Sequence, residues 1–337
     1  MTEKGRTRIG IIGAGAISQI VHLPILAERY DVDLVALADS DVHKAETLSR
    51  RFEVPVVMSA DELIDLDEVD ALLICTPNDL HEDLASRALE AGKHVLVERP
   101  LATTSRGAAR VIDAAERSGT VLSVGLPHRF RPEVMALRSF VQGGELGRLF
   151  AVRGSWLTRS VRSSRSSWRE NREVAGGGAL MDLGIPALDL GFWVIGYPQV
   201  ARVSCVMTAQ DGEVEHSATL MLETADGVAI TMEVSNRLFA GDDRYYVRVM
   251  GSEGSGSLPP LEVFKQLGGR PMELTPRQPK PRGGENPYTN AYRRLLDDFV
   301  RGVQGLGEPK IPREQIHLMA VLEAAYRSAE RGEEVSV

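Results

Sequence analysis

The stretch that decides the fold is Arg8-Ile9-Gly10-Ile11-Ile12-Gly13-Ala14-Gly15-Ala16-Ile17-Ser18. Its first five residues form a short, mainly apolar run, which is typical of a strand buried on both faces of a parallel sheet. Glycines follow directly, and they allow a tight turn before a helix begins. The stretch therefore predicts a strand, a glycine turn and a helix in direct succession.

Similar apolar runs recur along the first third of the chain and alternate with helix-like segments. They cover residues 34–38, 54–57, 71–75, 94–97 and 121–124. One intervening segment, residues 81–91, is amphipathic and is followed by Gly92, a residue suited to end a helix. This alternation predicts right-handed βαβ units and a doubly wound parallel sheet, the α/β Rossmann class.

The glycine turn has the composition of a dinucleotide-binding loop. Gly13 and Gly15 would let the backbone of the turn approach a pyrophosphate at the helix N-terminus, with Ala16 and Ile17 in the same turn. Ser18 stands where a third glycine is usual, and it is small enough for close packing of helix and strand. The alternative is a glycine turn that serves packing alone.

An acidic residue supports the nucleotide hypothesis. Asp39 ends the second apolar run, about 20 residues beyond the turn, where a carboxylate accepts hydrogen bonds from a ribose. Asp41 adds negative charge that would repel a 2′-phosphate, and no arginine is adjacent to Asp39. The sequence therefore predicts NAD rather than NADP as the cofactor, although a surface aspartate remains the alternative.

Composition limits the class of partner. The 337 residues carry a formal net charge of −8, which argues against nucleic acid or an anionic membrane as the main ligand. The N-terminal residues are charged and lack the apolar stretch of a signal peptide, so a cytoplasmic location without a membrane span is expected. Cys75 and Cys205 are expected to be buried, inert thiols, and the seven histidines lack metal-ligand spacing.

The pattern changes after about residue 126. Alternation with period two predicts strands at residues 149–156, 200–208, 215–222, 228–234 and 245–249. We expect a long surface loop at 268–287 and helices at 288–303 and 313–331. The sequence thus predicts a Rossmann domain at 1–126 and an α+β domain with a mostly antiparallel sheet at 127–337.

Several motifs together resemble the Gfo/Idh/MocA oxidoreductase family, and the resemblance covers nearly the whole chain. The motifs are the glycine turn, Cys75-Thr76-Pro77-Asn78-Asp79-Leu80-His81, Gly92-Lys93-His94-Val95-Leu96-Val97-Glu98-Arg99-Pro100, Gly176-Gly177-Gly178-Ala179-Leu180-Met181-Asp182-Leu183-Gly184 and Val321-Leu322-Glu323-Ala324-Ala325-Tyr326-Arg327-Ser328.

The resemblance implies a cofactor that lies over the cleft between two domains. Residues at positions that line the cofactor in the family are Thr76, Asn78, His81, Glu98 and Arg99. The resemblance also implies that residues 127–337 form a substrate-binding and oligomerisation domain with an open, mostly antiparallel sheet. A homodimer or homotetramer would form through this C-terminal sheet, with the C-terminal helix packed toward the Rossmann domain. Asn78 as a turn residue and His81 as a helix-start residue remain the alternatives.

Two residues depart from the family pattern at positions that handle protons. Arg99 stands where the family has lysine, and arginine, whose pKa exceeds about 12, cannot act as a base near neutral pH. Pro186 stands where histidine or tyrosine is usual, and it fits the first turn of a helix instead. We expect Arg99 to hold or polarise a substrate oxygen without transferring a proton.

Two residues could take over proton transfer. Asp182 keeps its family position and could act as a base. His128, in Gly125-Leu126-Pro127-His128-Arg129-Phe130, follows the last strand of the predicted Rossmann sheet and suits proton transfer at neutral pH. An exposed or hydrogen-bonded junction histidine is the alternative for His128.

A basic stretch precedes the glycine triplet. Its arginines are Arg159, Arg162, Arg165, Arg169 and Arg172, spaced to align on one helical face, although interleaved serines favour a loop. In the family this segment leads to the substrate, with Trp168 and Arg169 near the reaction. The stretch either binds an anionic substrate or is a solvated basic loop.

The sequence leaves three functions open. The first is an NAD-dependent oxidoreductase that acts on a sugar, a cyclitol or a related polyol, acidic ones included, with Asp182, Arg99 and His128 as catalytic residues. The second is a lyase or epimerase with internal redox and no net turnover of NAD. The third is a non-catalytic NAD-binding sensor or partner subunit, which the changes at Arg99 and Pro186 would permit.

Overall fold

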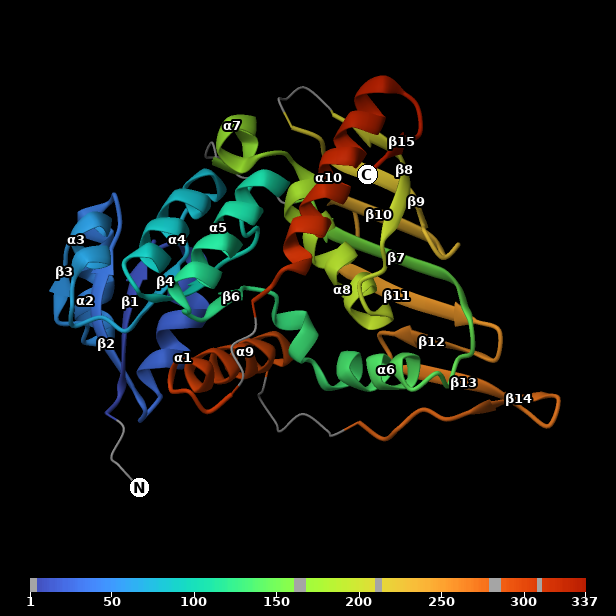
Figure 1. Cartoon of the computed structure of the whole chain (residues 1–337), viewed down its shortest axis with the longest axis horizontal. Helices are drawn as coiled ribbons and strands as arrows, with labels where there is room; N and C mark the ends of the chain where they lie inside the picture. Colours follow the sequence, from blue (N-terminus) through green and yellow to red (C-terminus); the bar gives the residue numbers. More distant parts are fainter. Residues whose placement is uncertain (1–4, 161–167, 210–213, 279–285, 308–310) are drawn as a thin grey trace. The chain divides into compact units, whose positions relative to one another are not determined.

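The computed structural model describes residues 5–160, 168–209, 214–278, 286–307 and 311–337 (Figure 1). The chain forms two compact units. Unit 1 contains Met1–Pro127 and Asn286–Gln315, and unit 2 contains His128–Glu285 and Ile316–Val337. The chain therefore returns to unit 1 late in the sequence and ends in unit 2.

Unit 1 is built on a six-stranded parallel sheet in the order β3-β2-β1-β4-β5-β6. Its interior strands are almost wholly buried, because helices need apolar strands on which to pack. The predicted Rossmann sheet is confirmed. The strands are β1 (Thr7–Ile12), β2 (Val32–Ala38), β3 (Val56–Val57), β4 (Ala71–Ile74), β5 (His94–Val97) and β6 (Leu122–Val124).

The helices of unit 1 follow the strands in alternation, and several of them begin at a residue whose side chain caps the helix. Thr104 caps the start of α5 by accepting the Gly107 N–H, and Gly119 ends that helix in the left-handed conformation. The helical segments are η1 (Ser18–His22), α1 (Leu23–Ala27), α2 (Val42–Phe52), α3 (Ala60–Asp65), η2 (Asn78–Leu80), α4 (His81–Glu90), α5 (Ser105–Ser118) and α9 (Pro287–Val303).

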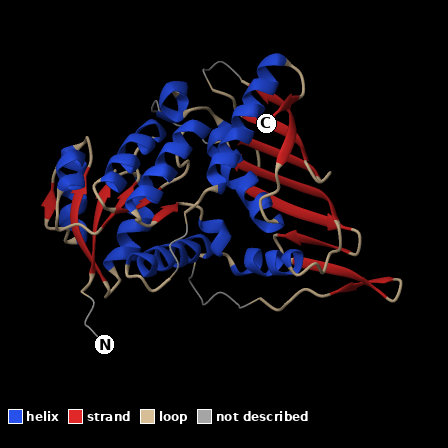
Figure 2. Ribbon diagram, in the orientation of Figure 1, coloured by secondary structure: helices blue, strands red, loops and turns tan. Residues whose placement is uncertain are grey.

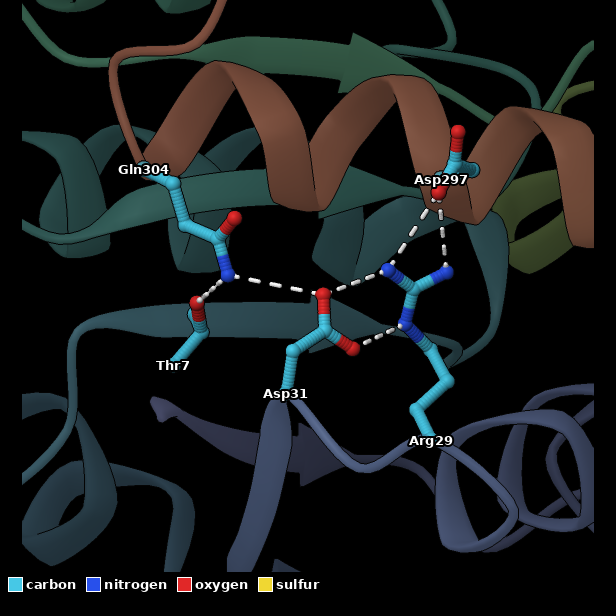
Figure 3. Close-up of polar contacts among 5 residues, drawn as sticks. All are labelled: Thr7, Arg29, Asp31, Asp297 and Gln304. Atoms are coloured by element: carbon cyan, nitrogen blue, oxygen red, sulfur yellow. Dashed lines mark hydrogen bonds and ion pairs between the residues drawn. The ribbon is translucent and has the colours of Figure 1, made fainter. Parts of the chain in front are cut away.

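Within unit 1, polar contacts join helix α9 to residues near the start of the chain (Figure 3). The Arg29 guanidinium donates to both carboxylate oxygens of Asp31, at 3.0 and 2.8 Å, and to Asp297 of α9 at 3.3 Å. Gln304, just beyond α9, donates to Thr7 at 3.2 Å. These contacts bind the late segment to the amino ends of β1 and β2.

Unit 2 is built on a nine-stranded sheet in the order β14-β13-β12-β11-β7-β10-β9-β8-β15. All neighbours are antiparallel except β7 and β10, which are parallel. Helices cover one face of this sheet (Figure 2). The strands are β7 (Leu149–Arg159), β8 (Val200–Thr208), β9 (Ser217–Thr224), β10 (Ala229–Leu238), β11 (Arg244–Gly251), β12 (Gly254–Leu258), β13 (Glu262–Leu267), β14 (Arg270–Glu273) and β15 (Val335–Ser336).

The long loop predicted at 268–287 is wrong in its first part. Gly268 and Gly269, both with positive φ, form a turn that joins β13 to β14 in an antiparallel hairpin. Every residue of β14 is exposed, so the strand has no apolar alternation that sequence analysis could detect. Residues 279–285 of the predicted loop lie outside the described residues.

The helical segments of unit 2 include a long buried stretch. Residues Arg172–Ile195 have the length and hydropathy of a membrane span, and 83% of the most apolar part is buried in the protein. We therefore describe it as a core element. The segments are η3 (Pro127–Phe130), α6 (Pro132–Gln142), η4 (Trp168–Glu170), α7 (Arg172–Ala175), η5 (Leu180–Gly184), α8 (Ile185–Ile195) and α10 (Glu314–Arg331).

Segment η1 of unit 1 and segment η5 of unit 2 are π-helical turns, and each is followed by a proline. Pro24 stands in the first turn of α1 and Pro186 in the first turn of α8, as predicted for Pro186. Proline has no N–H, so it cannot bond the carbonyl four residues earlier, and the preceding turn widens. Such π turns are frequent at functional sites. Here they follow the two glycine motifs.

We predict that Arg29→Ala lowers the free energy of unfolding by about 1–3 kcal/mol, because it leaves partly buried Asp31 without its guanidinium partner. Urea denaturation measures the change. Asp297→Asn is the matched control, since Asp297 is more than half exposed and its removal leaves the Arg29–Asp31 pair intact. Equal effects of the two substitutions would contradict the assignment.

Candidate functional site

The candidate cofactor residues of unit 1 gather at one edge of its sheet. β2, β1, β4 and β5 are neighbours and parallel, so their carboxyl ends lie side by side. The residues directly after these strands are Asp39, Gly13, Cys75 and Glu98. The connection changes direction between β1 and β4, and ligands of doubly wound sheets bind at this point.

Gly13 needs to be glycine. Its φ is +101°, and a Cβ atom at this position would lie 2.5 Å from the carbonyl oxygen of Cys75. Ser18, which is fully buried, donates its hydroxyl to the Gly13 carbonyl at 2.5 Å, and Gln19 donates to the Ala14 carbonyl at 2.9 Å. The serine at the third glycine position therefore closes the loop, a role that the sequence did not reveal.

The outer side of the loop is open to a ligand. A Cβ atom added to Gly15 would have only the Cys75 carbonyl within 4 Å, at 3.8 Å, so packing alone does not require glycine there. Ala16 is exposed, and Gly15 and Ile17 are partly exposed. The buried Thr76 hydroxyl, after β4, has no hydrogen-bond partner in the described part of the chain. A phosphate-bearing cofactor fits such a site.

Asp39 is connected to the glycine loop. Its carboxylate accepts the Ala14 N–H at 2.6 Å and the Asp41 N–H at 2.8 Å, and it pairs with the Lys44 ammonium at 2.9 Å. Lys44 was not expected as a partner of Asp39, because it lies five residues further along the chain. Asp41 caps α2 by accepting the Lys44 N–H, which brings the lysine back toward Asp39.

His81 connects the loops that follow β4 and β5. It is buried, and its two ring nitrogens lie 2.6 Å from the Pro100 carbonyl and 3.0 Å from the Thr76 carbonyl. Burial lowers the pKa of His81, so the ring is neutral and donates to one of the two carbonyls. Both ring nitrogens thus face backbone. Asn78, also buried, begins the η2 turn between these loops.

A buried polar cluster surrounds Glu98. His22 Nε2 lies 2.8 Å from Glu98 Oε1, and the Tyr292 hydroxyl of α9 donates to the same oxygen at 3.1 Å. The rings of His22 and Tyr292 meet edge to face, 5.3 Å between centroids. Gly125 makes room, because a Cβ there would lie 2.5 Å from Glu98 Oε2. Sequence analysis missed His22 and Tyr292, since neither lies near Glu98 along the chain.

The cluster carries opposite charges. Burial would lower the pKa of His22, but the Cys75 sulfur and the Glu98 carboxylate raise that pKa to about 10. Burial would raise the pKa of Glu98, but His22 and then Arg99 hold it below the usual range. His22 is therefore an imidazolium and Glu98 a carboxylate at neutral pH. Arg99 itself is partly exposed, next to this anion.

In unit 2, Asp182 occupies a distinctive position. It lies in η5, within the run from Gly177 to Phe192. All residues of this run except Asp182 are buried. Its N–H donates to the Gly178 carbonyl at 2.9 Å. A partly exposed carboxylate on an otherwise buried segment meets the need of a base for both a fixed position and access to a substrate.

His128 lies in an aromatic cluster on the helix-covered face of the unit 2 sheet. Its ring meets that of Trp156 edge to face at 4.6 Å, and Trp156 stacks on Tyr245 at 5.0 Å. Its neighbour Arg129 donates to Asp189 of α8 at 2.8 Å, which joins the η3 turn to the buried helix. His128 is therefore held in place and partly exposed.

The described arginines of the basic stretch do not share one helical face. Arg159 ends strand β7 and pairs with Asp243, whereas Arg169 lies in η4 and Arg172 begins α7. Arg162 and Arg165 lie outside the described residues. The exposed Arg169 guanidinium stacks over the Trp168 ring at 4.4 Å, so these two predicted substrate residues do lie together.

Comparison with known proteins identifies the family. Residues 7–126 match the model of the Gfo/Idh/MocA oxidoreductase family with an NAD-binding Rossmann fold, and residues 134–257 match the C-terminal domain model of the same family. D-glucoside 3-dehydrogenase of Escherichia coli (strain K12) is 30% identical, over 98% of this chain and 97% of the relative. The chain belongs to the Gfo/Idh/MocA family.

Solved structures agree with this assignment. GenD2 from gentamicin A biosynthesis, in complex with NAD, is 27% identical and superposes with a TM-score of 0.85, over 100% of this chain and 98% of the other. Levoglucosan dehydrogenase, in complex with NADH and levoglucosan, has a TM-score of 0.88 over 98% and 99%. At 22% identity the second likeness supports the fold alone.

As a member of the Gfo/Idh/MocA family, the chain binds NAD on its Rossmann domain, as the sequence predicted. The glycine loop, the Thr76 hydroxyl and Asp39 are the residues that fit it. The roles assigned to single residues stay predictions. Among the described residues, no group of three His, Cys, Asp or Glu side chains could hold a metal ion.

We predict that Gly13→Ala weakens NAD binding at least tenfold, which is about 1.4 kcal/mol, because the methyl group would displace the loop from the Cys75 carbonyl. Titration calorimetry measures the binding. Gly92→Ala is the matched control, since Gly92 also has positive φ but nothing within 4 Å of an added Cβ. NAD binding by Gly13→Ala at the strength of the parent protein would refute the assigned role.

We predict that His22→Gln lowers the free energy of unfolding by about 3–5 kcal/mol at pH 7, because it leaves the Glu98 carboxylate without its buried partner. The His22 pKa is raised on folding, so this contribution is complete below about pH 6.5 and is lost as pH rises toward 10. The difference between parent and variant should therefore shrink with pH in urea denaturation.

The exposed His43 supplies the control, and His43→Gln should lower the free energy of unfolding by less than about 1 kcal/mol at pH 7. A difference between the parent protein and His22→Gln that stays constant from pH 7 to pH 10 would argue against a buried imidazolium.

Proposed function

We propose that the chain is an NAD-dependent oxidoreductase that transfers hydride between nicotinamide and a hydroxyl-bearing carbon of a sugar, a cyclitol or a related polyol. The observation that carries the proposal is the family match across both units, with a relative described as a D-glucoside 3-dehydrogenase. Levoglucosan dehydrogenase shares the fold. The comparisons give no support to internal redox chemistry or to a non-catalytic sensor.

The proposed chemistry divides the work between cofactor and protein. When bound, NAD would supply the hydride acceptor, its nicotinamide ring. The substrate hydroxyl must lose a proton at the same time, and Asp182 is the base that we favour, because it combines a fixed backbone with an accessible carboxylate. His128 is the second candidate. Arg99 holds the substrate oxygen with its guanidinium and stays protonated.

Substrate binding involves the second unit in this proposal. The stacked pair Trp168 and Arg169 offers an aromatic face and a guanidinium, which together suit a sugar with an acidic substituent. A neutral polyol would need the aromatic face only. The choice between the two follows from a substrate screen.

We further propose a homo-oligomer that forms through the C-terminal sheet. The strand register puts Val206, Met221, Tyr246 and Phe264, from four strands, on the face opposite to the helices. All four are exposed, between 38% and 72%. Burial of such apolar side chains against a second copy favours association. The proposed assembly is a dimer or a tetramer in the cytoplasm, where the free, buried Cys75 and Cys205 stay reduced.

We predict that the purified protein releases NADH with one class of sugar, cyclitol or polyol, and that Asp182→Asn lowers kcat at least 100-fold without changing the Kd for NAD. His128→Ala distinguishes the second candidate. The measurement is absorbance of NADH across a substrate panel, with NAD binding followed by calorimetry.

Full activity in Asp182→Asn together with a large loss in His128→Ala would transfer the role of base to His128. Tight NAD binding without turnover on any compound of the panel would contradict the proposed function itself.

A further inference from the structure

Glu215 is a buried carboxylate that neither the sequence motifs nor the family match assigns to the reaction. It precedes strand β9 and is 7% exposed. Its Oε1 accepts the Gly178 N–H and the Leu180 N–H, both at 2.9 Å, and its backbone carbonyl accepts the Ala179 N–H at 2.8 Å. One residue thus binds three successive amides at the start of the segment that carries Asp182.

Tyr326 of helix α10 completes this arrangement. Its hydroxyl donates to Glu215 Oε1 at 2.9 Å. Burial and then the Glu215 carboxylate raise the pKa of Tyr326, so the hydroxyl remains protonated and keeps donating. The carboxylate therefore receives donors from two elements that are far apart in the sequence.

The contacts of Glu215 and Tyr326 with this segment require residues without a side chain in the glycine triplet, residues 176–178. Gly176 ends α7 with φ of +78°. A Cβ on Gly177 would overlap the Tyr326 hydroxyl, and a Cβ on Gly178 would overlap the Glu215 backbone. The close approach of Tyr326 and Glu215 thus explains Gly177 and Gly178, and the left-handed end of α7 explains Gly176, with no ligand needed.

The contacts reach Asp182 through a short path. The Asp182 N–H donates to the carbonyl of Gly178, whose own N–H is held by Glu215. The π turn η5 begins at Leu180, the last amide that Glu215 holds, and packs against strand β10. A negative charge at the start of a helical segment is stabilised by the exposed N–H groups, so the anion and the segment support each other.

We infer that Glu215 and Tyr326 are positioning residues, which fix the backbone of η5 so that Asp182 meets the substrate hydroxyl in a productive geometry. The inference rests on the proposed function, in which Asp182 is the base. A displacement of about 1 Å at a catalytic group can lower a rate about 100-fold. Loss of these contacts therefore lowers kcat more than it weakens binding.

The variants are Glu215→Gln, which brings an NH₂ group against amides that need an acceptor, and Tyr326→Phe, which removes one donor. Glu215→Gln is expected to lower kcat about 10- to 100-fold and Tyr326→Phe about 3- to 10-fold. The KM for substrate should change less than about threefold, and the Kd for NAD should not change. Rates are taken per NAD-binding protomer, well below each Tm.

Ser328→Ala is the matched control, because Ser328 is a buried hydroxyl on the same helix that binds Cys205 and Glu333 and not the glycine triplet. It should lower Tm without changing kcat. Glu215→Gln and Tyr326→Phe with lowered Tm but kcat within twofold of the parent would show a structural role alone and overturn the inference.

A second measurement separates this inference from the proposed function. Hydrogen–deuterium exchange of residues 178–186 should accelerate at least tenfold in Glu215→Gln and remain at the parent rate in Ser328→Ala. If the parent protein turns over no compound, accelerated exchange still supports the positioning of η5, and the failure then belongs to the proposed function. Unchanged exchange in Glu215→Gln refutes the positioning role in either case.

Discussion

Gly13 lies so close to the end of β4 that a Cβ atom there would be 2.5 Å from the carbonyl oxygen of Cys75. This contact brings the first turn of the chain to the point where the strand order of the parallel sheet changes direction. Two side chains then stabilise the turn. Ser18 closes the turn through the Gly13 carbonyl, and Asp39 holds the Ala14 amide. The resulting loop, at the N-terminus of a helical segment, is where a phosphate-bearing cofactor fits.

Unit 2 also contains glycines that allow a close contact with the backbone just before a π turn. The glycine triplet allows Glu215 and Tyr326 to approach the backbone, and a π turn then leads into a helix whose first turn contains proline. In both units a contact that depends on glycine precedes a π turn. A proline two residues after that turn has no N–H to donate to the carbonyl four residues earlier. Pro186 therefore has a structural effect, because it widens the turn that carries Asp182, although it lacks the proton-handling side chain usual at this position.

Charge is balanced locally at the candidate site. Glu98 is paired with a buried imidazolium and bonded by Tyr292, so the carboxylate next to Arg99 is neutralised from within unit 1. Lys44 similarly pairs with Asp39. Because the stability of the Glu98 anion does not depend on Arg99 alone, the guanidinium can bind a substrate oxygen in the proposed mechanism without leaving a buried charge uncompensated.

The sequence by itself determined the class of the fold, the glycine loop, Asp39 and the family motifs, because these depend on apolar runs and turns that are local in the chain. It could not find β14, whose residues are all exposed. It also could not place Arg159, Arg169 and Arg172, because charge spacing alone does not distinguish a strand end from a helix. Only the tertiary structure decided the partners of Glu98 and Glu215. Each carboxylate is bonded by a tyrosine more than 100 residues away, and such pairs arise from packing, which no local pattern records.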